Sequence, residues 1–308
     1  MSATQRDVKD RIDSVKNIQK ITRAMEMVAA ARLRRAEQRI EALRPYARAI
    51  RRMTRQAAEA AGSEISGLPI LQEHESEDTV ALLLVTGDRG LAGAFNSQII
   101  RAGLRAAREH EDGGRSVRYS VVGRRGVSTL TFRGKDPVGY VGFTDRPSYA
   151  DAREIAEDLI AAYVDGKADR VEIFYNGYIS ALSQEVRRET LLPLQQATIF
   201  EGTERDREGA EDDDEAEDDS GHHALVEYEP DPGEILERLV PDYVEISVYR
   251  ALLESTASEH GARMTAMRNA SENAGELIDD LTLEMNRARQ AEITQEILEV
   301  VAGAEGLT

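Results

Sequence analysis

A stripe of mostly apolar positions spaced three and four residues apart runs along the first part of the chain. Its members are Val15, Ile18, Thr22, Met25, Ala29, Arg32 and Ala36, and then, one residue out of step, Ile40 and Leu43. Residues 4–61 contain no glycine and one proline, Pro45, so we expect one long helix that is kinked or loosened at Pro45. The narrow stripe is typical of a coiled coil rather than of a globular core helix. The segment GSEISGLP at 62–69 ends the helix.

The last part of the chain has a longer stripe of the same kind. It runs through Met264, Met267, Ser271, Ala274, Ile278, Leu281, Met285 and Ala288, and the same frame reaches back through Ala257, Leu253, Arg250, Ile246 and Tyr243. This length predicts a coiled-coil helix. Residues 4–61 are the only candidate partner, so we expect antiparallel pairing with Met25 opposite the 264–288 stripe. At about 1.5 Å per residue the last helix should overhang the first by about 20 Å, and such a tip needs an outside partner.

Between the two helices the pattern changes to short apolar runs that alternate with helical stretches. Strands are predicted at 79–86, 117–123 and 170–178, helices are predicted at 97–110 and 150–166, and residues 184–194 close the series as a strand or edge segment. This alternation favours a parallel, doubly wound sheet. The predicted fold class is therefore α/β plus long helices: an antiparallel coiled coil of the N- and C-terminal helices with an inserted doubly wound α/β domain.

Four parts follow from these patterns. They are an N-terminal coiled-coil helix at 1–62, an α/β domain at 77–200, an acidic insertion at 201–224 and a C-terminal coiled-coil helix at 231–308. Residues 201–220 carry 12 acidic residues and two arginines, and we expect the insertion to be disordered. It also contains His222 and His223, for which solvated loop histidines are a simpler interpretation than metal ligands.

Charge is segregated along a chain whose net charge is -18. Residues 1–60 carry 15 Lys and Arg against 7 acidic residues, whereas residues 231–308 carry 16 acidic residues against 6 Arg, so the two ends should attract one another. The chain has no cysteine, which excludes disulfides and thiolate sites and fits a reducing compartment. We expect no signal peptide and no membrane span, so that any membrane association runs through partners.

The loop GDRGLAGAFN follows a predicted strand and precedes a predicted helix, as a phosphate-binding loop does. Its glycines stand at 87, 90 and 93, with Arg89 where the G-x-G-x-x-G motif needs glycine. A tight turn explains these glycines more simply. An α/β nucleotide-binding protein with helical arms nevertheless remains the alternative function, and it predicts nucleotide binding by the isolated chain.

No set of residues suggests catalysis. Serines stand outside any G-x-S-x-G motif, the five histidines are scattered, and the adjacent Asp279 and Asp280 fit a solvated helix face. We therefore expect no catalytic, cofactor-binding or metal-binding residues.

Nucleic-acid binding has one feature in its favour, the cluster Arg32, Arg34, Arg35, Arg39, Arg51, Arg52 and Arg55. The cluster lacks interleaved aromatic residues and belongs to an acidic chain, so an acidic protein partner fits it better. A coiled-coil nucleic-acid adaptor would instead show salt-sensitive binding to DNA or RNA.

Both ends of the chain resemble the gamma subunit of the F-type ATP synthase. The matching segments are RIDSVKNIQKITRAMEMVAAARLRRAEQ and NRARQAEITQEILEVVAGAEG, and the second contains the family's C-terminal pattern in Ile293, Thr294, Glu296, Glu299, Gly303 and Ala304. LLLVTGDRGLAGAFN and EYEPDP resemble inner segments of the same family, whereas the acidic stretch departs from it.

The resemblance implies a rotating central stalk, present in one copy per complex, that couples proton flow through the membrane c-ring to ATP synthesis or hydrolysis. It implies three alpha and three beta subunits around the protruding C-terminal helix, with the epsilon subunit and the c-ring at the α/β domain, on the cytoplasmic face of the cell membrane. Beta-subunit contacts then fall to Met25, Arg289, Gln290, Thr294 and Glu299, and c-ring or epsilon contacts to Tyr228 and Glu229. Catalysis belongs to the other subunits, and neither a cofactor nor nucleic acid is implied.

Overall fold

The computed structural model describes residues 5–62, 68–194 and 231–305. The chain divides into two compact units, which we call the coil unit (Met1–Ala31 with Arg263–Thr308) and the α/β unit (Arg32–Ala262). Two helices pass through both units, α1 (Gln5–Ala61) and α7 (Pro232–Glu305). The helix α1 continues through Pro45 and ends at Ala61, as its pattern predicts.

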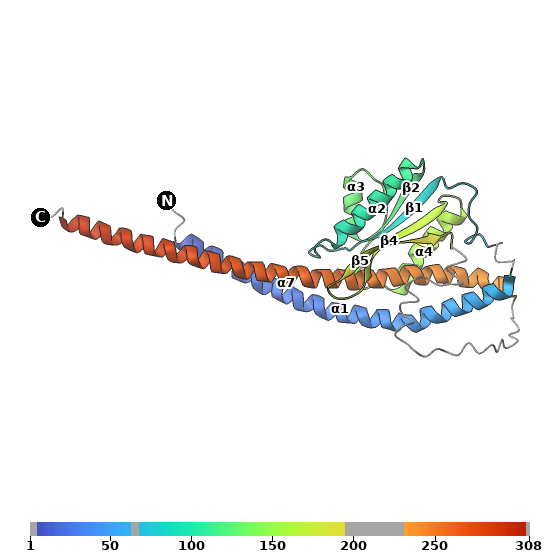
Figure 1. Ribbon diagram of the computed structural model, residues 1–308, viewed down its shortest axis with the longest axis horizontal. Helices are drawn as coiled ribbons and strands as arrows, with labels where there is room; N and C mark the ends of the chain where they lie inside the picture. The colour runs from blue at the N-terminus through green and yellow to red at the C-terminus, as the bar shows by residue number, and fades with distance from the viewer. Residues whose placement is uncertain (1–4, 63–67, 195–230, 306–308) are drawn as a thin grey trace. The chain divides into compact units, whose positions relative to one another are not determined.

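The α/β unit contains a five-stranded sheet in the order β3-β2-β1-β4-β5 (Figure 1). The strands are β1 (Thr79–Val85), β2 (Ser116–Val122), β3 (Val138–Tyr140), β4 (Arg170–Tyr178) and β5 (Gln184–Leu192). The first four are parallel, and β5 pairs antiparallel to β4, so the sheet is mixed rather than wholly parallel. The link between β4 and β5 is too short for the crossover that a parallel pair requires, and it forms a hairpin instead.

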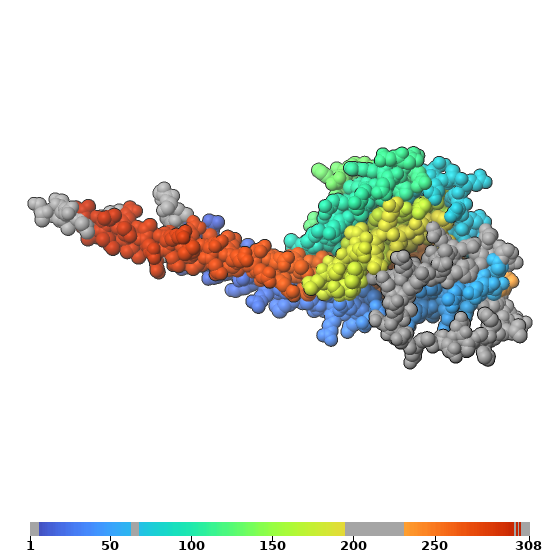
Figure 2. All heavy atoms as spheres, in the orientation of Figure 1, coloured from blue at the N-terminus to red at the C-terminus, as the bar shows by residue number. Residues whose placement is uncertain are grey.

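Helices cover both faces of the sheet. Alternate residues of β1 point to opposite faces, with Leu82 packing towards α2 (Phe95–Asp112) and α3 (Arg124–Phe132), and Leu83 packing towards α4 (Tyr149–Val164), α1 and α7. This alternation follows from the two-residue period of a strand. In the space-filling view, α2 and β5 meet without a gap on the face shown (Figure 2).

Two of these elements were absent from the sequence-based prediction. The helix α3 has nine residues and begins without a side-chain cap, and β3 has three residues. Segments this short do not repeat an apolar pattern often enough to be identified by it.

Within the coil unit, α1 and α7 run antiparallel. Val8 and Ile12 form a buried cluster with Leu281. Further along α1, Gln19 Nε2 donates to the Ser271 carbonyl at 3.2 Å and Glu26 pairs with Arg268 at 2.9 Å, so rising numbers on α1 meet falling numbers on α7. Along α7 the predicted stripe is the buried face, with its members buried or half-buried from Met264 to Ala288.

One position of the predicted α1 stripe does not lie on the buried face, so the prediction was wrong there. Ile18 is 54% exposed, and Gln19 faces α7 instead. The reason lies in the partner helix, because a Cβ at Gly275 would come within 3.1 Å of Gln19 Nε2. The missing side chain of Gly275 makes room for a polar residue that can donate to a backbone carbonyl.

The antiparallel pairing predicts a specific cross-link. With Ile12→Cys and Leu281→Cys in a chain that has no natural cysteine, a short bifunctional thiol reagent should join the two residues within one chain, because both lie in one buried cluster. The matched control pairs Ile12→Cys with Asp280→Cys, whose position is exposed. Equal yields of intramolecular product, measured by mass spectrometry, would refute the register.

None of the helices in the described ranges has an apolar stretch long enough to cross a bilayer.

Candidate functional site

The last turns of α7 expose both polar and apolar side chains. Arg289, Gln290 and Thr294 are exposed, as the predicted contacts require, although Thr294 Oγ1 donates to the Gln290 carbonyl at 2.8 Å in its own helix. The apolar residues of the same stretch are exposed too: Ile293, Ile297, Leu298 and Val300. Glu299 belongs to α7, but its side chain lies outside the described residues. Exposed apolar side chains grouped in this way are typical of a surface that binds another protein.

The basic part of α1 has one buried side and one exposed side. Ala29, Leu33 and Ala36 are buried, and Met25 is half-buried along the same line. In the coil unit the other side exposes four large apolar side chains, Ile18, Ile21, Met27 and Val28. The exposed side is available to a partner.

Arginines of the predicted basic patch also have partners within the chain, such as Arg55, whose Nε lies 3.9 Å from Glu59 Oε1. Arg32 Nη1 pairs with Asp145 Oδ2 at 2.9 Å, between α1 and the loop that follows β3. Arg34 and Arg35 on the neighbouring turns are exposed. Tyr228 and Glu229 lie outside the described residues, as do the insertion at 201–224 and its two histidines.

The crevice in which doubly wound proteins bind nucleotides is filled by α7. Ligands of such folds bind at the carboxyl ends of the strands where the strand order reverses, which here is between β1 and β4. At this place Ser258 Oγ donates to the Asn176 carbonyl at 3.0 Å. The Glu259 carboxylate lies so close to Gly87 that a Cβ on Gly87 would be 2.8 Å from it.

The loop after β1 also has its own internal partners. The Gly87 amide donates to Asn96 Oδ1 at 2.8 Å. Asp88 accepts from the amides of Arg124, Gly142 and Thr144 and from the Thr144 hydroxyl. Burial alone would raise the pKa of Asp88, but these donors hold it below its usual value. The first two amides of this loop are therefore already paired, that of Gly87 with Asn96 and that of Asp88 with Thr144 Oγ1 at 2.9 Å.

The cavity beside this loop has a volume of only about 10 Å³ and is lined by Thr86, Thr144, Thr256 and Glu259 among others. This is room for about one water molecule, whereas ligand pockets span about 300–1,000 Å³. The geometry therefore disfavours nucleotide binding at this site.

This geometry makes a direct prediction for the isolated chain. Calorimetric titration with MgATP or MgADP should give no saturable heat, because α7 occupies the crevice and the Gly87 and Asp88 amides are already paired. The control is the same chain heated past its unfolding transition, which should give an indistinguishable trace. A saturable signal from the folded chain alone would favour the nucleotide-binding alternative.

The carboxyl edge of the sheet exposes a second surface that the sequence analysis missed. Leu91 follows β1, Val141 follows β3, and Ile179 and Leu182 follow β4, and each of these large apolar side chains is about half exposed or more. Exposed Arg89, Arg124 and Arg125 come from loops at the same edge. Because the carboxyl ends of parallel strands meet at one edge, these residues share one end of the α/β unit.

Leu91 has a backbone conformation that leucine rarely adopts, with φ at 62°. The left-handed region is costly for a residue with a Cβ, and the side chain gains no burial because it is 65% exposed. Such a residue is typical of a contact site. The sequence signal for this exposed residue is an apolar side chain within a glycine-rich loop. A tight turn alone accounts for the glycines but not for the leucine.

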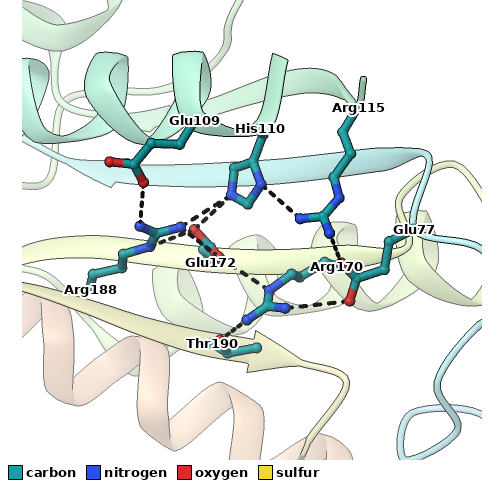
Figure 3. Close-up of polar contacts among 8 residues, drawn as sticks. All are labelled: Glu77, Glu109, His110, Arg115, Arg170, Glu172, Arg188 and Thr190. Carbon is teal, nitrogen blue, oxygen red and sulfur yellow. Dashed lines mark hydrogen bonds and ion pairs between the residues drawn. The ribbon is translucent and has the colours of Figure 1, made fainter. Parts of the chain in front are cut away.

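A charged network lies between α2, β4 and β5 (Figure 3). Glu172, which is 2% exposed, accepts from Arg188 at 2.9 and 3.1 Å and lies 3.3 Å from His110 Nε2. Arg188 also bonds Glu109 of α2 at 2.9 Å. Burial alone would raise the pKa of Glu172, but the hydrogen bond and charge of Arg188, with a smaller effect of His110, hold it below its usual value.

This network ties elements together rather than forming a metal site. Each of its glutamates, Glu77, Glu109 and Glu172, is paired with arginine, and within the described parts of the chain no group of three His, Cys, Asp or Glu residues is placed to hold a metal ion. Its role is therefore to secure the end of α2 against the sheet.

Comparison with known proteins agrees with the fold. A family model described as ATP synthase matches residues 4–307. The chain is 42% identical to the ATP synthase gamma chain of Rubrobacter xylanophilus over 99% of both chains. It is also 42% identical to the gamma chain of Streptomyces coelicolor, over 100% of this chain and 97% of that one.

Solved structures show the same architecture. A chain of the central stalk and c-ring of the Tetrahymena thermophila mitochondrial ATP synthase has a TM-score of 0.57 and 26% identity, over 82% of this chain and 99% of that one. A rotor chain of the Euglena gracilis mitochondrial ATP synthase has a TM-score of 0.63 over 95% and 100% of the two chains, and at 20% identity it supports the fold alone. Together with the family match and the identity to curated relatives, these findings show that the chain belongs to the ATP synthase gamma-chain family.

Proposed function

We propose that this gamma chain works as a non-catalytic shaft that turns inside a ring of three alpha and three beta subunits, one copy per complex. As a gamma chain it is a subunit of ATP synthase and forms the rotating stalk that couples the membrane c-ring to the alpha-beta ring. We also propose that it is a peripheral subunit on the cytoplasmic face of the cell membrane. The observation that carries the shaft role is the exposed, apolar and polar end of α7, which needs a surrounding protein.

Rotation of such a shaft changes the nucleotide sites only if its surface differs around its axis. The coil unit meets this condition, because one helix continues past the residues that pack against the other. A beta subunit that meets the basic side of α1 has a different contact free energy from one that meets α7. Differential contact is what any ligand or partner needs in order to shift a conformational equilibrium.

The proposal includes specific contacts, which rest on the resemblance of the end segments to the family. Arg289, Gln290, Thr294 and Glu299 on α7 and Met25 on α1 would bind beta subunits. Arginine suits this role because it makes charge-assisted bonds to carboxylates or carbonyls. Tyr228 and Glu229 would meet the c-ring or the epsilon subunit.

The surface at the carboxyl edge of the sheet adds a further contact to this proposal. Its exposed Leu91, Ile179 and Leu182 lie at the same edge as Arg89 and Arg125. Apolar and positively charged side chains together suit an acidic protein surface with apolar residues. Within the assembled enzyme we assign this surface to a neighbouring subunit.

The alternative function, a nucleotide-binding protein with helical arms, has less support. The crevice is filled by α7, and the loop amides of Gly87 and Asp88 already donate to Asn96 and Thr144. We keep the four-part division at 1–62, 77–200, 201–224 and 231–308 as part of the proposal. Compact packing gives a different division, because the boundaries between its two units fall within α1 and within α7.

The shaft role is tested by assembly. Purified alpha and beta subunits mixed with this chain should yield a complex that hydrolyses ATP and drives rotation of a bead attached to the α/β unit. Failure of the chain to co-purify with alpha and beta at low and at physiological salt would count decisively against the proposal.

The contact of Arg289 makes a sharper prediction. In the assembled complex, Arg289→Ala should lower ATP turnover by about ten-fold, as expected for a lost charge-assisted bond of about 1.5 kcal/mol. The melting temperature of the isolated chain should not change, because the side chain is exposed. Arg287→Ala is the control on the same exposed part of α7. Equal turnover in the two variants would contradict the assignment.

A further inference from the structure

Among the polar contacts of the described residues, four join the helices α1 and α7 to the carboxyl edge of the sheet and form one set. They are Arg32 with Asp145 at 2.9 Å, Glu37 with the Tyr178 hydroxyl, the Thr256 hydroxyl with the Thr144 carbonyl at 3.0 Å, and the Ser258 hydroxyl with the Asn176 carbonyl at 3.0 Å. We call this set the collar. All four contacts lie inside the α/β unit, close to the residues at which each helix passes into the coil unit.

We propose that the collar is the joint through which torque passes between the α/β unit and the two helices, with Tyr178 and Ser258 as its principal positioning residues. This inference rests on the proposed shaft function and adds the residues that hold the shaft to its base. Only the α/β unit and the segments of α1 and α7 within it take part.

The collar adds directional contacts to a surface that also contains apolar contacts. Val248, Ala251 and Leu252 of α7 belong to the apolar core cluster, whereas the following turns bury polar side chains as well, such as Thr256, Ser258 and Glu259. Apolar contact is non-directional, so it resists separation of the surfaces more than it resists sliding or twisting. A hydrogen bond weakens steeply when its angle changes, so it resists twisting directly.

Burial makes two of these bonds costly to break. Ser258 and Asn176 are almost inaccessible, at 0% and 1% exposure. A broken bond there leaves a donor and an acceptor that water cannot reach. Close packing adds a steric stop, because a Cβ on Gly261 would lie 3.0 Å from the Ala181 carbonyl of the β4–β5 hairpin.

The contact on α1 is of a different type. The Tyr178 hydroxyl at the end of β4 donates to the Glu37 carboxylate, and burial together with this carboxylate raises the pKa of Tyr178. Both side chains are only half-buried, so the bond can be removed without opening a core. Strand β4 thus contacts α1 through Tyr178 and contacts α7 through Asn176, which lies two residues earlier on the same strand.

The test compares matched pairs of variants in the assembled, rotating complex. Tyr178→Phe with Ser258→Ala removes two collar bonds. Tyr140→Phe with Ser247→Ala removes the same atoms elsewhere, where Tyr140 bonds Asp158 of α4 at 2.8 Å and Ser247 bonds the Tyr243 carbonyl of its own helix at 2.9 Å. A bead is attached through Arg105→Cys on the exposed side of α2, which is the only thiol of the chain.

The measured quantity is the angular variance of the bead while the ring waits for ATP, which is inversely proportional to torsional stiffness. If the four contacts act as parallel springs of similar strength, losing two raises the variance by up to about two-fold. Unloaded ATP hydrolysis should stay unchanged, whereas protons pumped per ATP against a gradient should fall. The control pair should match the wild type in all three measurements.

Single changes guard against a folding defect. Tyr178→Phe alone should raise the angular variance without changing the melting temperature, and Glu37→Ala should have the same effect. Glu37→Gln should keep the wild-type variance, because its amide oxygen still accepts from the Tyr178 hydroxyl. Equal variance in the collar and control variants would overturn the inference. A wild-type complex that assembles but does not rotate would instead refute the proposed shaft function.

Discussion

Gly123→Ala should destabilise the α/β unit by about 3 kcal/mol or more, a cost expected for backbone strain combined with a steric clash. Gly123 stands between β2 and α3 with φ at 92°, a conformation that residues with a Cβ rarely adopt. A Cβ there would lie 2.3 Å from the Thr86 carbonyl oxygen and 2.6 Å from its carbon. Both are backbone atoms, so the ends of β1 and β2 would have to separate. Urea unfolding of the isolated chain measures this loss.

Gly134 provides the control for this substitution. Its φ is 73°, and a Cβ there would have no neighbour within 4 Å. Gly134→Ala therefore carries the conformational strain without the clash and should cost about 1 kcal/mol. If both alanine variants lost the same stability, the clash with Thr86 would not be the cause.

Glu172→Gln should lower the free energy of unfolding at pH 7 by about 2–3 kcal/mol, because it leaves the nearby arginines without their buried counter-charge. The folded-state pKa of Glu172 is depressed chiefly by Arg188 against the opposing effect of burial, so its contribution is fully present above the usual value of 4.5. This contribution is lost as the pH falls through the lower, folded-state pKa. Asp88 and Asp169 have lowered pKa values and act in the same direction below about pH 4.

The wild-type chain should consequently lose stability as the pH falls from about 5 towards 3, and Glu172→Gln should show a shallower decline. Thermal unfolding at half-unit pH steps measures both. Glu157→Gln is the control, since Glu157 pairs with Arg153 at 2.8 Å on an exposed helix face. Exposed pairs contribute at most about 1 kcal/mol. A pH profile of Glu172→Gln parallel to that of the wild type would show that Glu172 is not a main source of the acid sensitivity.

In the gamma chain, torsional stiffness and the stability of the α/β unit come from different contacts. The Gly123 turn and the Glu172 network hold the α/β unit together. The collar holds that unit to the helices α1 and α7. A variant of the first kind should melt early, and a variant of the second kind should melt normally but transmit torque poorly.

Much of the fold was predictable because its signals are local. The three-four stripe from Met264 to Ala288 identifies the packed face of α7, and the apolar run at 79–86 identifies β1. The buried face of a helix or strand can be identified from the spacing of its apolar residues, which follows the backbone period of 3.6 or 2 residues. The motifs at both ends of the chain carried the family resemblance, which the curated relatives confirm.

The remaining features were decided by residues far apart in the sequence. The side chain that faces α7 is Gln19 rather than Ile18 because Gly275 stands opposite it. The glycine loop at 87–93 stands between a strand and a helix, as a phosphate-binding loop does, but Glu259 and Ser258 of α7 fill the crevice beside it. Leu91 and Leu182 form one exposed edge because parallel strands bring their carboxyl ends together. Periodicity reports which side of an element is buried, but only tertiary packing decides what covers that side, because the covering atoms come from other parts of the chain.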